Sequence, residues 1–279
     1  MAHAASGRLN PMNHLIYEKR DGIAYLTMNR PERRNALSPQ MIVEMAAAWE
    51  DFRQDTDARV AVLTGAGDIA FCAGADLGLL IPLFSRAREA EDEYDEALIK
   101  DRSLMQVALL RDFELYKPVI AAVNGFALAG GTEILQATDI RISVPTGEFG
   151  LTEVSRGIVP GGGSLVRLAR QVPYCKAMEI LLLGERMPAA EALRIGLINE
   201  IVPDNDLQRR ATEIAQRIAQ NGPLAVAACK EAVIRTSGLE LNEAFPIENE
   251  ISARIMRTED AVEGPQAFVE KRQPQFKGR

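Results

Sequence analysis

The chain has 279 residues, 47% of them hydrophobic and 25% charged, which is ordinary for a globular protein and enough for a large core. Its 32 basic and 39 acidic residues give a net charge of −7, which argues against a nucleic-acid partner held by bulk charge. No apolar run approaches the roughly 20 residues of a membrane span, and residues 1–14 lack the apolar middle of a signal peptide. We therefore expect a cytoplasmic protein with no membrane partner.

Histidine and cysteine are scarce in this chain. The only histidines are His3 and His14, which argues against a Ser-His-Asp relay and against a histidine metal site. The three cysteines, Cys72, Cys175 and Cys229, share no metal-binding spacing and are expected to be reduced thiols. We therefore expect no metal, and acid–base chemistry has to rest on carboxylates.

The N-terminal part predicts a hairpin followed by a helix. Asp21-Gly22 is a two-residue turn signal between apolar strands at 14–20 and 23–29. Ser38-Pro39 predicts a helix N-cap with proline at the first helical position, and the amphipathic pattern continues to about Arg53.

Two loops in this part are ambiguous. The loop 30–37 carries three arginines, which suit either a solvated loop or a phosphate contact. After a buried strand at 60–64, residues 65–70 match a loose dinucleotide-binding fingerprint. The match is weak, because residues 71–74 predict an extended piece and a turn where the fingerprint requires a helix.

The next stretch combines a ligand-binding signal with the least predictable part of the chain. The small residues of 73–77 (AGADL) let a ligand lie against the main chain. The apolar run 79–84 contains Pro82, so we expect it to line a pocket and not to extend a regular helix. The charged run 86–100 suits a solvated helix or a mobile segment.

A glycine pair stands at the centre of the chain. The buried strand predicted at 118–123 leads to Gly130-Gly131, and the residues that follow predict a helix with Glu133 in its first turn. Unpaired N–H groups at such a helix start favour negative charge on a ligand. The alternative is a plain strand-to-helix turn, in which an acidic residue complements the helix dipole.

A second carboxylate follows after one more strand. Glu153 lies in an irregular segment beyond the strand predicted at 139–144, and the glycine run 161–163 precedes a further helix. Taken alone, Glu153 suits a surface position. Because only one strand separates it from Glu133, both side chains can face one cleft, and two carboxylates around one water form an acid–base pair.

These motifs together resemble the crotonase (enoyl-CoA hydratase/isomerase) superfamily. The resemblance covers nearly the whole chain from about residue 15, in family order, through the segments 29–38, 62–77, 117–143, 148–168, 190–203 and 267–278. It implies an α/β fold with a spiral of ββα-like turns. The implied parts are a flexible lead (1–14), a spiral acyl-CoA-binding catalytic core (15–203) and a C-terminal helical region (204–279) for oligomerisation and for covering the site.

The resemblance also implies the roles of four residues. The backbone N–H groups of Ala75 and Gly130 would form an oxyanion hole for a thioester carbonyl. Glu133 and Glu153 would hold one water, one as base and one as acid, with the assignment between them left open. No cofactor is implied, because coenzyme A is part of the acyl-CoA substrate, and the expected assembly is a trimer or a hexamer made of two trimers.

The expected function is that of an enoyl-CoA hydratase of fatty acid metabolism. An enoyl-CoA isomerase, a specialised dehydratase of the carnitinyl-CoA type and a non-catalytic acyl-CoA-binding protein are the alternatives. Family likeness assigns substrate binding to Arg34, Ala73, Ala75, Asp76, Leu77, Gly78, Gly130, Gly161 and Lys271. Three residues depart from the usual pattern, Gly78, Ala129 and Thr152, and the segment 79–114 is longer than in short-chain hydratases.

Overall fold

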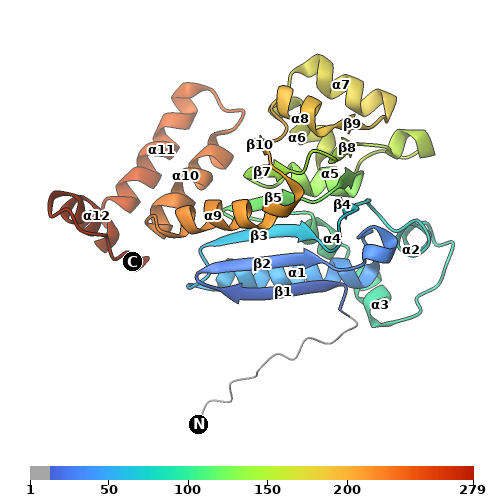
Figure 1. The fold of residues 1–279 in the computed structure, drawn as a ribbon, viewed down its shortest axis with the longest axis horizontal. Coiled ribbons are helices and arrows are strands. Elements are labelled where there is room, and N and C mark those ends of the chain that lie inside the picture. The colour runs from blue at the N-terminus through green and yellow to red at the C-terminus, as the bar shows by residue number, and fades with distance from the viewer. Residues whose placement is uncertain (1–12) are drawn as a thin grey trace, which may run out of the picture.

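Two β-sheets form the centre of the molecule (Figure 1). The computed structural model describes residues 13–279, so most of the predicted lead at 1–14, including His3, lies outside the described residues. The six-stranded sheet has the order β1-β2-β3-β5-β7-β10 and the four-stranded sheet the order β4-β6-β8-β9. Their strands are β1 (Leu15–Arg20), β2 (Ile23–Met28), β3 (Val60–Gly65), β4 (Ala70–Cys72), β5 (Val119–Val123), β6 (Phe126–Leu128), β7 (Ile140–Ser143), β8 (Glu148–Gly150), β9 (Met187–Pro188) and β10 (Glu200–Ile201).

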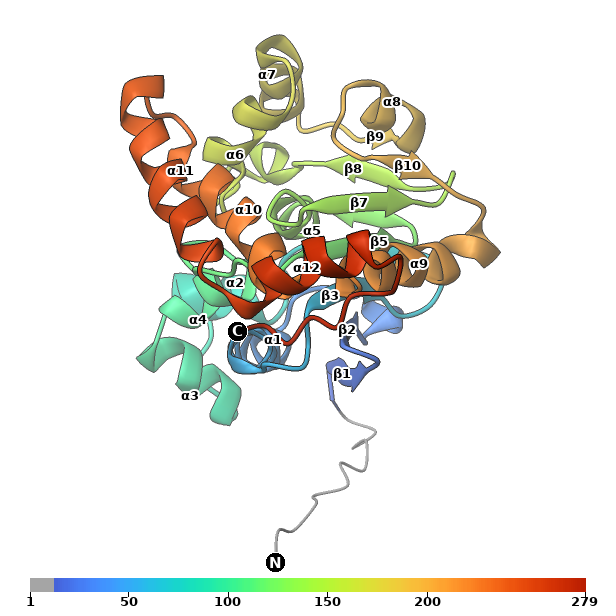
Figure 2. The same cartoon turned by 90° about the vertical axis from the view of Figure 1, so that its left-hand side faces the viewer.

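The chain winds through both sheets as a spiral. Each turn adds one strand to the large sheet and the next strand to the small one, as in β3–β4, β5–β6 and β7–β8. Successive turns pair in parallel in both sheets, and Figure 2 shows β7 and β8 one above the other with α5 (Gly130–Leu135) beside them. The predicted α/β spiral is confirmed.

The N-terminal elements follow their sequence signals. β1 and β2 pair antiparallel from Leu15–Met28 to Arg20–Ile23, and Asp21 and Gly22 have positive φ angles of 53° and 75°, as the tight hairpin turn requires. The helix α1 (Pro39–Gln54) begins at its predicted cap, where Ser38 Oγ accepts the Met41 N–H at 3.1 Å.

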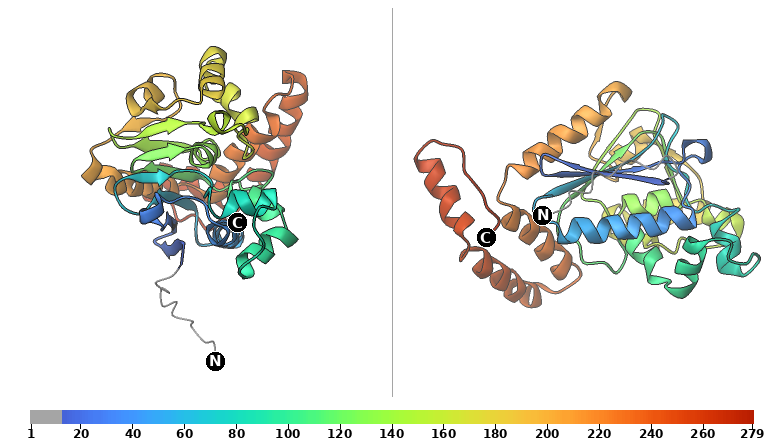
Figure 3. Two further views of the ribbon diagram at one scale, coloured as in Figure 1. Left: turned by 90° about the vertical axis from the view of Figure 1, so that its right-hand side faces the viewer. Right: turned by 90° about the horizontal axis from the view of Figure 1, so that it is seen from below.

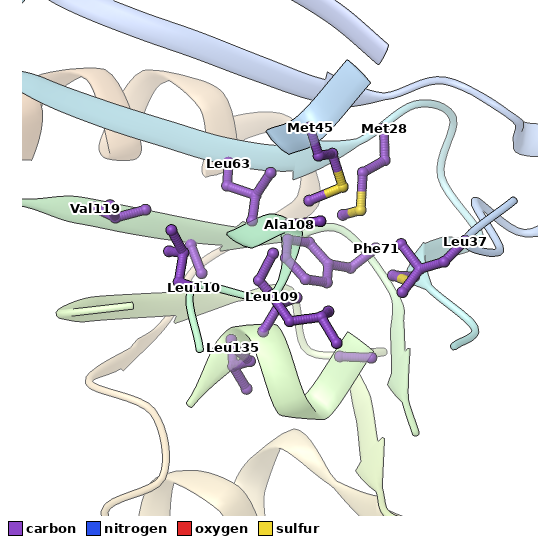
Figure 4. Close-up of a cluster of buried hydrophobic side chains, with 14 of the residues drawn as sticks. Met28, Leu37, Met45, Leu63, Phe71, Ala108, Leu109, Leu110, Val119 and Leu135 are labelled. Atoms are coloured by element: carbon purple, nitrogen blue, oxygen red, sulfur yellow. The ribbon is translucent and has the colours of Figure 1, made fainter. Parts of the chain in front are cut away.

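The two faces of the large sheet are covered by different elements. On β3, Val60 and Val62 point to a cluster with α9 (Leu207–Ala219), whereas Ala61 and Leu63 point to the main core under α1. Figure 4 shows part of that main core, where Leu63, Leu109 and Leu135 come from the sheet, from the end of α4 (Ser103–Ala108) and from α5.

The segment 79–114 forms three short helices, α2 (Leu80–Ser85), α3 (Glu93–Lys100) and α4. The expectation that 79–84 avoids a regular helix is wrong, because Pro82 occupies the first turn, where no intrahelical N–H donor is needed. The charged run 86–100 is partly anchored, since the buried Asp95 carboxylate pairs with Arg88 at 2.5 Å.

From Ser164 onward the chain is mainly helical. Its α-helices are α6 (Ser164–Gln171), α7 (Tyr174–Leu183), α8 (Ala189–Arg194), α9, α10 (Pro223–Thr236), α11 (Leu241–Ile255) and α12 (Glu259–Val269). Figure 3 shows the C-terminal helices to one side of the sheets. They expose large apolar side chains: Val233, Ile234, Leu241, Phe245, Met256, Val262 and Phe268. Among residues 13–279, no helix is long and apolar enough to cross a membrane.

Candidate active site

The turn from β6 into α5 is fixed by close backbone contacts. Ala129 has φ 50° and ψ −121°, a conformation that costs a non-glycine residue about 1–3 kcal/mol, and its N–H donates to the Gly150 carbonyl at 2.8 Å. A Cβ atom on Gly131 would lie 2.2 Å from the Cys72 carbonyl oxygen, so only glycine fits where α5 meets β4. The start of α5 is therefore held rigidly.

Two backbone donors lie side by side at this turn. A Cβ atom on Gly130 would lie only 3.8 Å from the Ala75 nitrogen. Gly74, with φ 92°, allows this close approach of the two loops. Among the residues that the structure describes, neither the Ala75 N–H nor the Gly130 N–H has a hydrogen-bond acceptor, and both residues line one cavity. The pair can receive an oxygen atom that carries negative charge.

Asp76 fixes the loop that carries the Ala75 donor. Its side chain is 4% exposed, and one carboxylate oxygen lies 3.0 Å from the Arg30 guanidinium. The other oxygen accepts the N–H groups of Gly78 and Leu79 at 2.9 and 3.1 Å. Asp76 and Gly78 do not line the cavity, so their contribution to ligand binding is indirect.

Glu133 points into the cavity from the first turn of α5. It is 5% exposed, and its Oε1 atom accepts the N–H groups of Gly162 and Ser164 at 2.7 and 3.3 Å. Burial raises the pKa of Glu133, while these two N–H groups and the charges of Arg167 and Arg111 act in the opposite direction. Four groups therefore favour the carboxylate form.

Glu153 reaches the same cavity from the 3₁₀ helix η2 (Glu153–Arg156), which follows β8. It is 7% exposed, and its Oε2 atom has no hydrogen-bond partner within residues 13–279. Burial, reinforced by the charge of Glu133, raises the pKa of Glu153 to about 7. Burial outweighs the four opposing groups, so the pKa of Glu133 also lies above its ordinary value. The two carboxyl groups still differ, because two N–H groups donate to Glu133 Oε1, whereas Glu153 Oε2 has no partner in the described part of the chain.

The cavity measures about 530 Å³ and brings together most of the residues predicted from the sequence. Its lining includes Arg34, Ala73, Ala75, Leu77, Gly130, Glu133, Glu153 and Gly161. Lys271, which follows α12, does not line it, and its assignment to substrate binding stays a prediction.

Sequence reasoning missed part of the site. Gly162 and Ser164 orient Glu133, and the glycine run 161–163 was a visible signal, but nothing in the sequence connects it to a residue 29 positions earlier. It also missed a wall of the cavity on α4. That helix lies in the charged and least regular part of the chain, where no motif indicates which side chains face inward.

Comparison with known proteins identifies the family of this chain. A model of the enoyl-CoA hydratase/isomerase family matches residues 18–279. The chain belongs to this family. The crotonase superfamily membership predicted from the motifs is therefore confirmed.

Similar proteins extend over nearly the whole chain. An enoyl-CoA hydratase of Mycobacterium tuberculosis, EchA19, is 44% identical over 95% of this chain and 96% of its own length. A carnitinyl-CoA dehydratase of Proteus mirabilis is 39% identical over 93% of this chain and 97% of its own. The crystal structure of an enoyl-CoA hydratase from Bacillus anthracis, 36% identical, superposes with a TM-score of 0.86 over 95% of this chain and all of that one.

Proposed function

We propose that this protein is an enoyl-CoA hydratase, which reversibly adds water in syn fashion to a trans-2-enoyl-CoA and yields a 3-hydroxyacyl-CoA. One observation carries the proposal: Glu133 and Glu153 line the same cavity as the unpaired N–H groups of Ala75 and Gly130. An acid, a base and two preorganised donors are the groups that hydration of a conjugated thioester needs.

The two N–H groups act on the thioester carbonyl. They donate to its oxygen, which draws electron density from the conjugated double bond and makes the β-carbon electrophilic. When a nucleophile adds there, negative charge develops on the same oxygen as an enolate. Such preorganised donors contribute about 3 kcal/mol each, because they need no reorganisation during the reaction.

The two glutamates divide the proton transfers. Glu133, whose Oε1 atom accepts two backbone N–H groups, takes a proton from the water whose hydroxyl group adds to the β-carbon. Glu153, protonated near neutral pH, delivers a proton to the α-carbon on the same face. One proton is gained by Glu133 and one is lost by Glu153, so a proton exchange between the pair restores the starting state.

The rest of the proposal concerns the ligand and the assembly. We assign no cofactor, since coenzyme A enters as part of the substrate, and its pantetheine and phosphates would follow Arg34, Ala73 and Leu77. Trimers, or hexamers made of two trimers, are supported by the apolar side chains that α10 to α12 expose. Free cysteines, two of them exposed, favour a reducing compartment such as the cytoplasm.

A dehydratase of a specialised acyl group is the second candidate. The relative named carnitinyl-CoA dehydratase favours it, and the same acid–base pair serves the reverse reaction. A panel of enoyl-CoA and hydroxyacyl-CoA esters, with products identified by mass spectrometry, tests the proposal. We expect 3-hydroxyacyl-CoA from 2-enoyl-CoA. Migration of the double bond without water uptake would indicate an isomerase, and binding without turnover would indicate a non-catalytic acyl-CoA-binding protein.

A further inference from the structure

One wall of the cavity is a single face of α4. Its lining residues are Arg102, Met105, Gln106 and Leu109, which recur at the spacing of one helix face. Leu109 lies near the Glu133 carboxylate, since a Cβ on Gly162 would stand 2.6 Å from Leu109 Cδ1 and 2.8 Å from Glu133 Oε2. Arg102 precedes it by seven residues, about 10 Å along a helix axis. The wall therefore leads away from Glu133.

The wall changes in character along its length. Its inner part is apolar, formed by Met105 and Leu109 and faced by Ile81 and Phe84 of α2. Gln106 stands next to Met105 in the middle of the wall, and the exposed Arg102 stands at its far end. The Arg102 guanidinium lies 5.8 Å from the centre of the Phe84 ring, so the cation is held at the edge of the apolar surface.

Five arginines line the cavity, and three of them already have partners. Arg111 donates to the Gly161 carbonyl at 2.5 Å, Arg156 donates to the Thr152 carbonyl at 2.9 Å, and Arg186 pairs with Glu148 at 3.2 Å. These three arginines support the loops around the site.

Arg34 and Arg102 remain. Both residues are exposed, and in the described part of the chain neither side chain has a hydrogen-bond or ion-pair partner; the contact of Arg102 is the Phe84 ring. The Arg34 carbonyl accepts the Ala73 N–H at 3.0 Å, which puts Arg34 on the loop assigned to coenzyme A. Arg102 is therefore the lining arginine available to the acyl group.

We infer that the preferred acyl group ends in a carboxylate, which Arg102 binds with help from Gln106, and that its middle part is apolar. The inference rests on the proposed function and specifies its substrate class. A purely apolar acyl end would cover the Arg102 cation without compensating its charge. A carboxylate restores the lost solvation through charge-assisted hydrogen bonds, the strongest that a guanidinium forms.

Two esters of equal chain length test this inference, a trans-2-enoyl-CoA with a terminal carboxylate and one with a terminal methyl group. We expect wild-type kcat/KM to be roughly 10-fold or more higher for the carboxylate ester, the size of a charge-assisted contact. Arg102→Met should remove this preference and leave the methyl ester within about 2-fold, while Arg102→Lys retains part of it. Arg170→Met on α6, outside the cavity, is the control.

Other results would overturn the inference. Equal use of both esters by the wild type would do so, as would equal slowing of both esters by Arg102→Met. Weaker binding of free coenzyme A to Arg102→Met would assign Arg102 to a phosphate. Calorimetry with the two saturated esters separates this inference from the proposed reaction. A preference for the carboxylate ester that depends on Arg102 would support the inference even if neither enoyl ester were hydrated.

Discussion

The two carboxylates come from regions of opposite character. Around Glu133, all six residues of α5 are buried, and Gly131 has no space for a side chain. Around Glu153, the only buried residue of η2 is the glutamate itself, and the loop beyond it is open: a Cβ on Gly157 or Gly161 would meet no atom within 4 Å. One region is tightly packed, and the other surrounds one buried acid with an exposed loop.

This difference explains how two identical side chains acquire different roles. The packed region supplies two N–H donors that bind Glu133 Oε1 and offset part of the rise in its pKa that burial causes. In the open region, the Glu153 carboxyl group is buried, and its Oε2 atom has no hydrogen-bond partner among residues 13–279. Burial therefore raises the pKa of Glu153, and the group keeps its proton up to about pH 7. Ile158 and Val159 of the open loop also line the cavity, so adaptation to an acyl group is expected here and not in α5.

The largest effect on folding stability that we predict contrasts one glycine of each region. Gly131→Ala should cost about 3 kcal/mol of folding free energy or more, because the new Cβ would meet the Cys72 backbone at 2.2 Å. Gly161→Ala should change stability by no more than about 0.5 kcal/mol, because its site is open. Urea denaturation measures both. Equal losses would remove the distinction between a packed and an open region.

The loop that carries the Ala75 N–H should be as sensitive to substitution as the packed region. Asp76→Asn leaves the buried Arg30 cation without its partner, and we expect a loss of about 3 kcal/mol together with a lower kcat, because Ala75 is the adjacent residue. The control is Glu259→Gln, which breaks an exposed pair with Arg279 and should cost less than about 0.5 kcal/mol. Urea denaturation and turnover assays read out both variants. A stable Asp76→Asn protein with unchanged kcat would contradict this account.

The open region should show a smaller effect with a distinctive pH dependence. The folded-state pKa of Glu153, about 7, lies above the ordinary 4.5, so folded protein binds the extra proton and stability falls as pH rises through this window. Glu153→Gln cannot lose a proton, so the variant escapes this fall in stability. It should be more stable than the wild type by about 2 kcal/mol at pH 8, with almost no gain at pH 4. Thermal denaturation at both pH values tests this.

A control accompanies the pH experiment. Glu50→Gln, on the exposed side of α1, should leave stability nearly unchanged at both pH values. A gain for Glu153→Gln that is the same at pH 4 and pH 8 would show that the proton on Glu153 has no part in it.

Much of the fold could be predicted from the sequence, because its signals are local. The Asp21-Gly22 turn, the Ser38 cap and the β-branched strands each act through neighbouring residues. The cleft shared by Glu133 and Glu153 could also be predicted, since a single strand of the large sheet, β7, separates the spiral turns that carry them. Family likeness then connected these residues to the donors on Ala75 and Gly130.

The remaining features depend on tertiary contacts that no local pattern encodes. Asp76 was expected at the ligand, but its partner Arg30 lies 46 positions earlier and buries the carboxylate behind the loop. The direction of Arg102 depends on how α4 packs against α1 and on its contact with the Phe84 ring. Pro82 predicts an interrupted helix, but α2 begins at Leu80, so Pro82 falls in its first turn, where the missing N–H costs nothing.

The central claim is that Glu133 and Glu153 act together on one water. Its most direct test is the rate at which 2-enoyl-CoA absorbance is lost with the wild type, Glu133→Gln, Glu153→Gln and the double variant. We predict that each single variant lowers kcat about 10³-fold with KM little changed, and that the double variant is hardly slower, because the pair works as a unit. Unchanged rates in both single variants would contradict the claim.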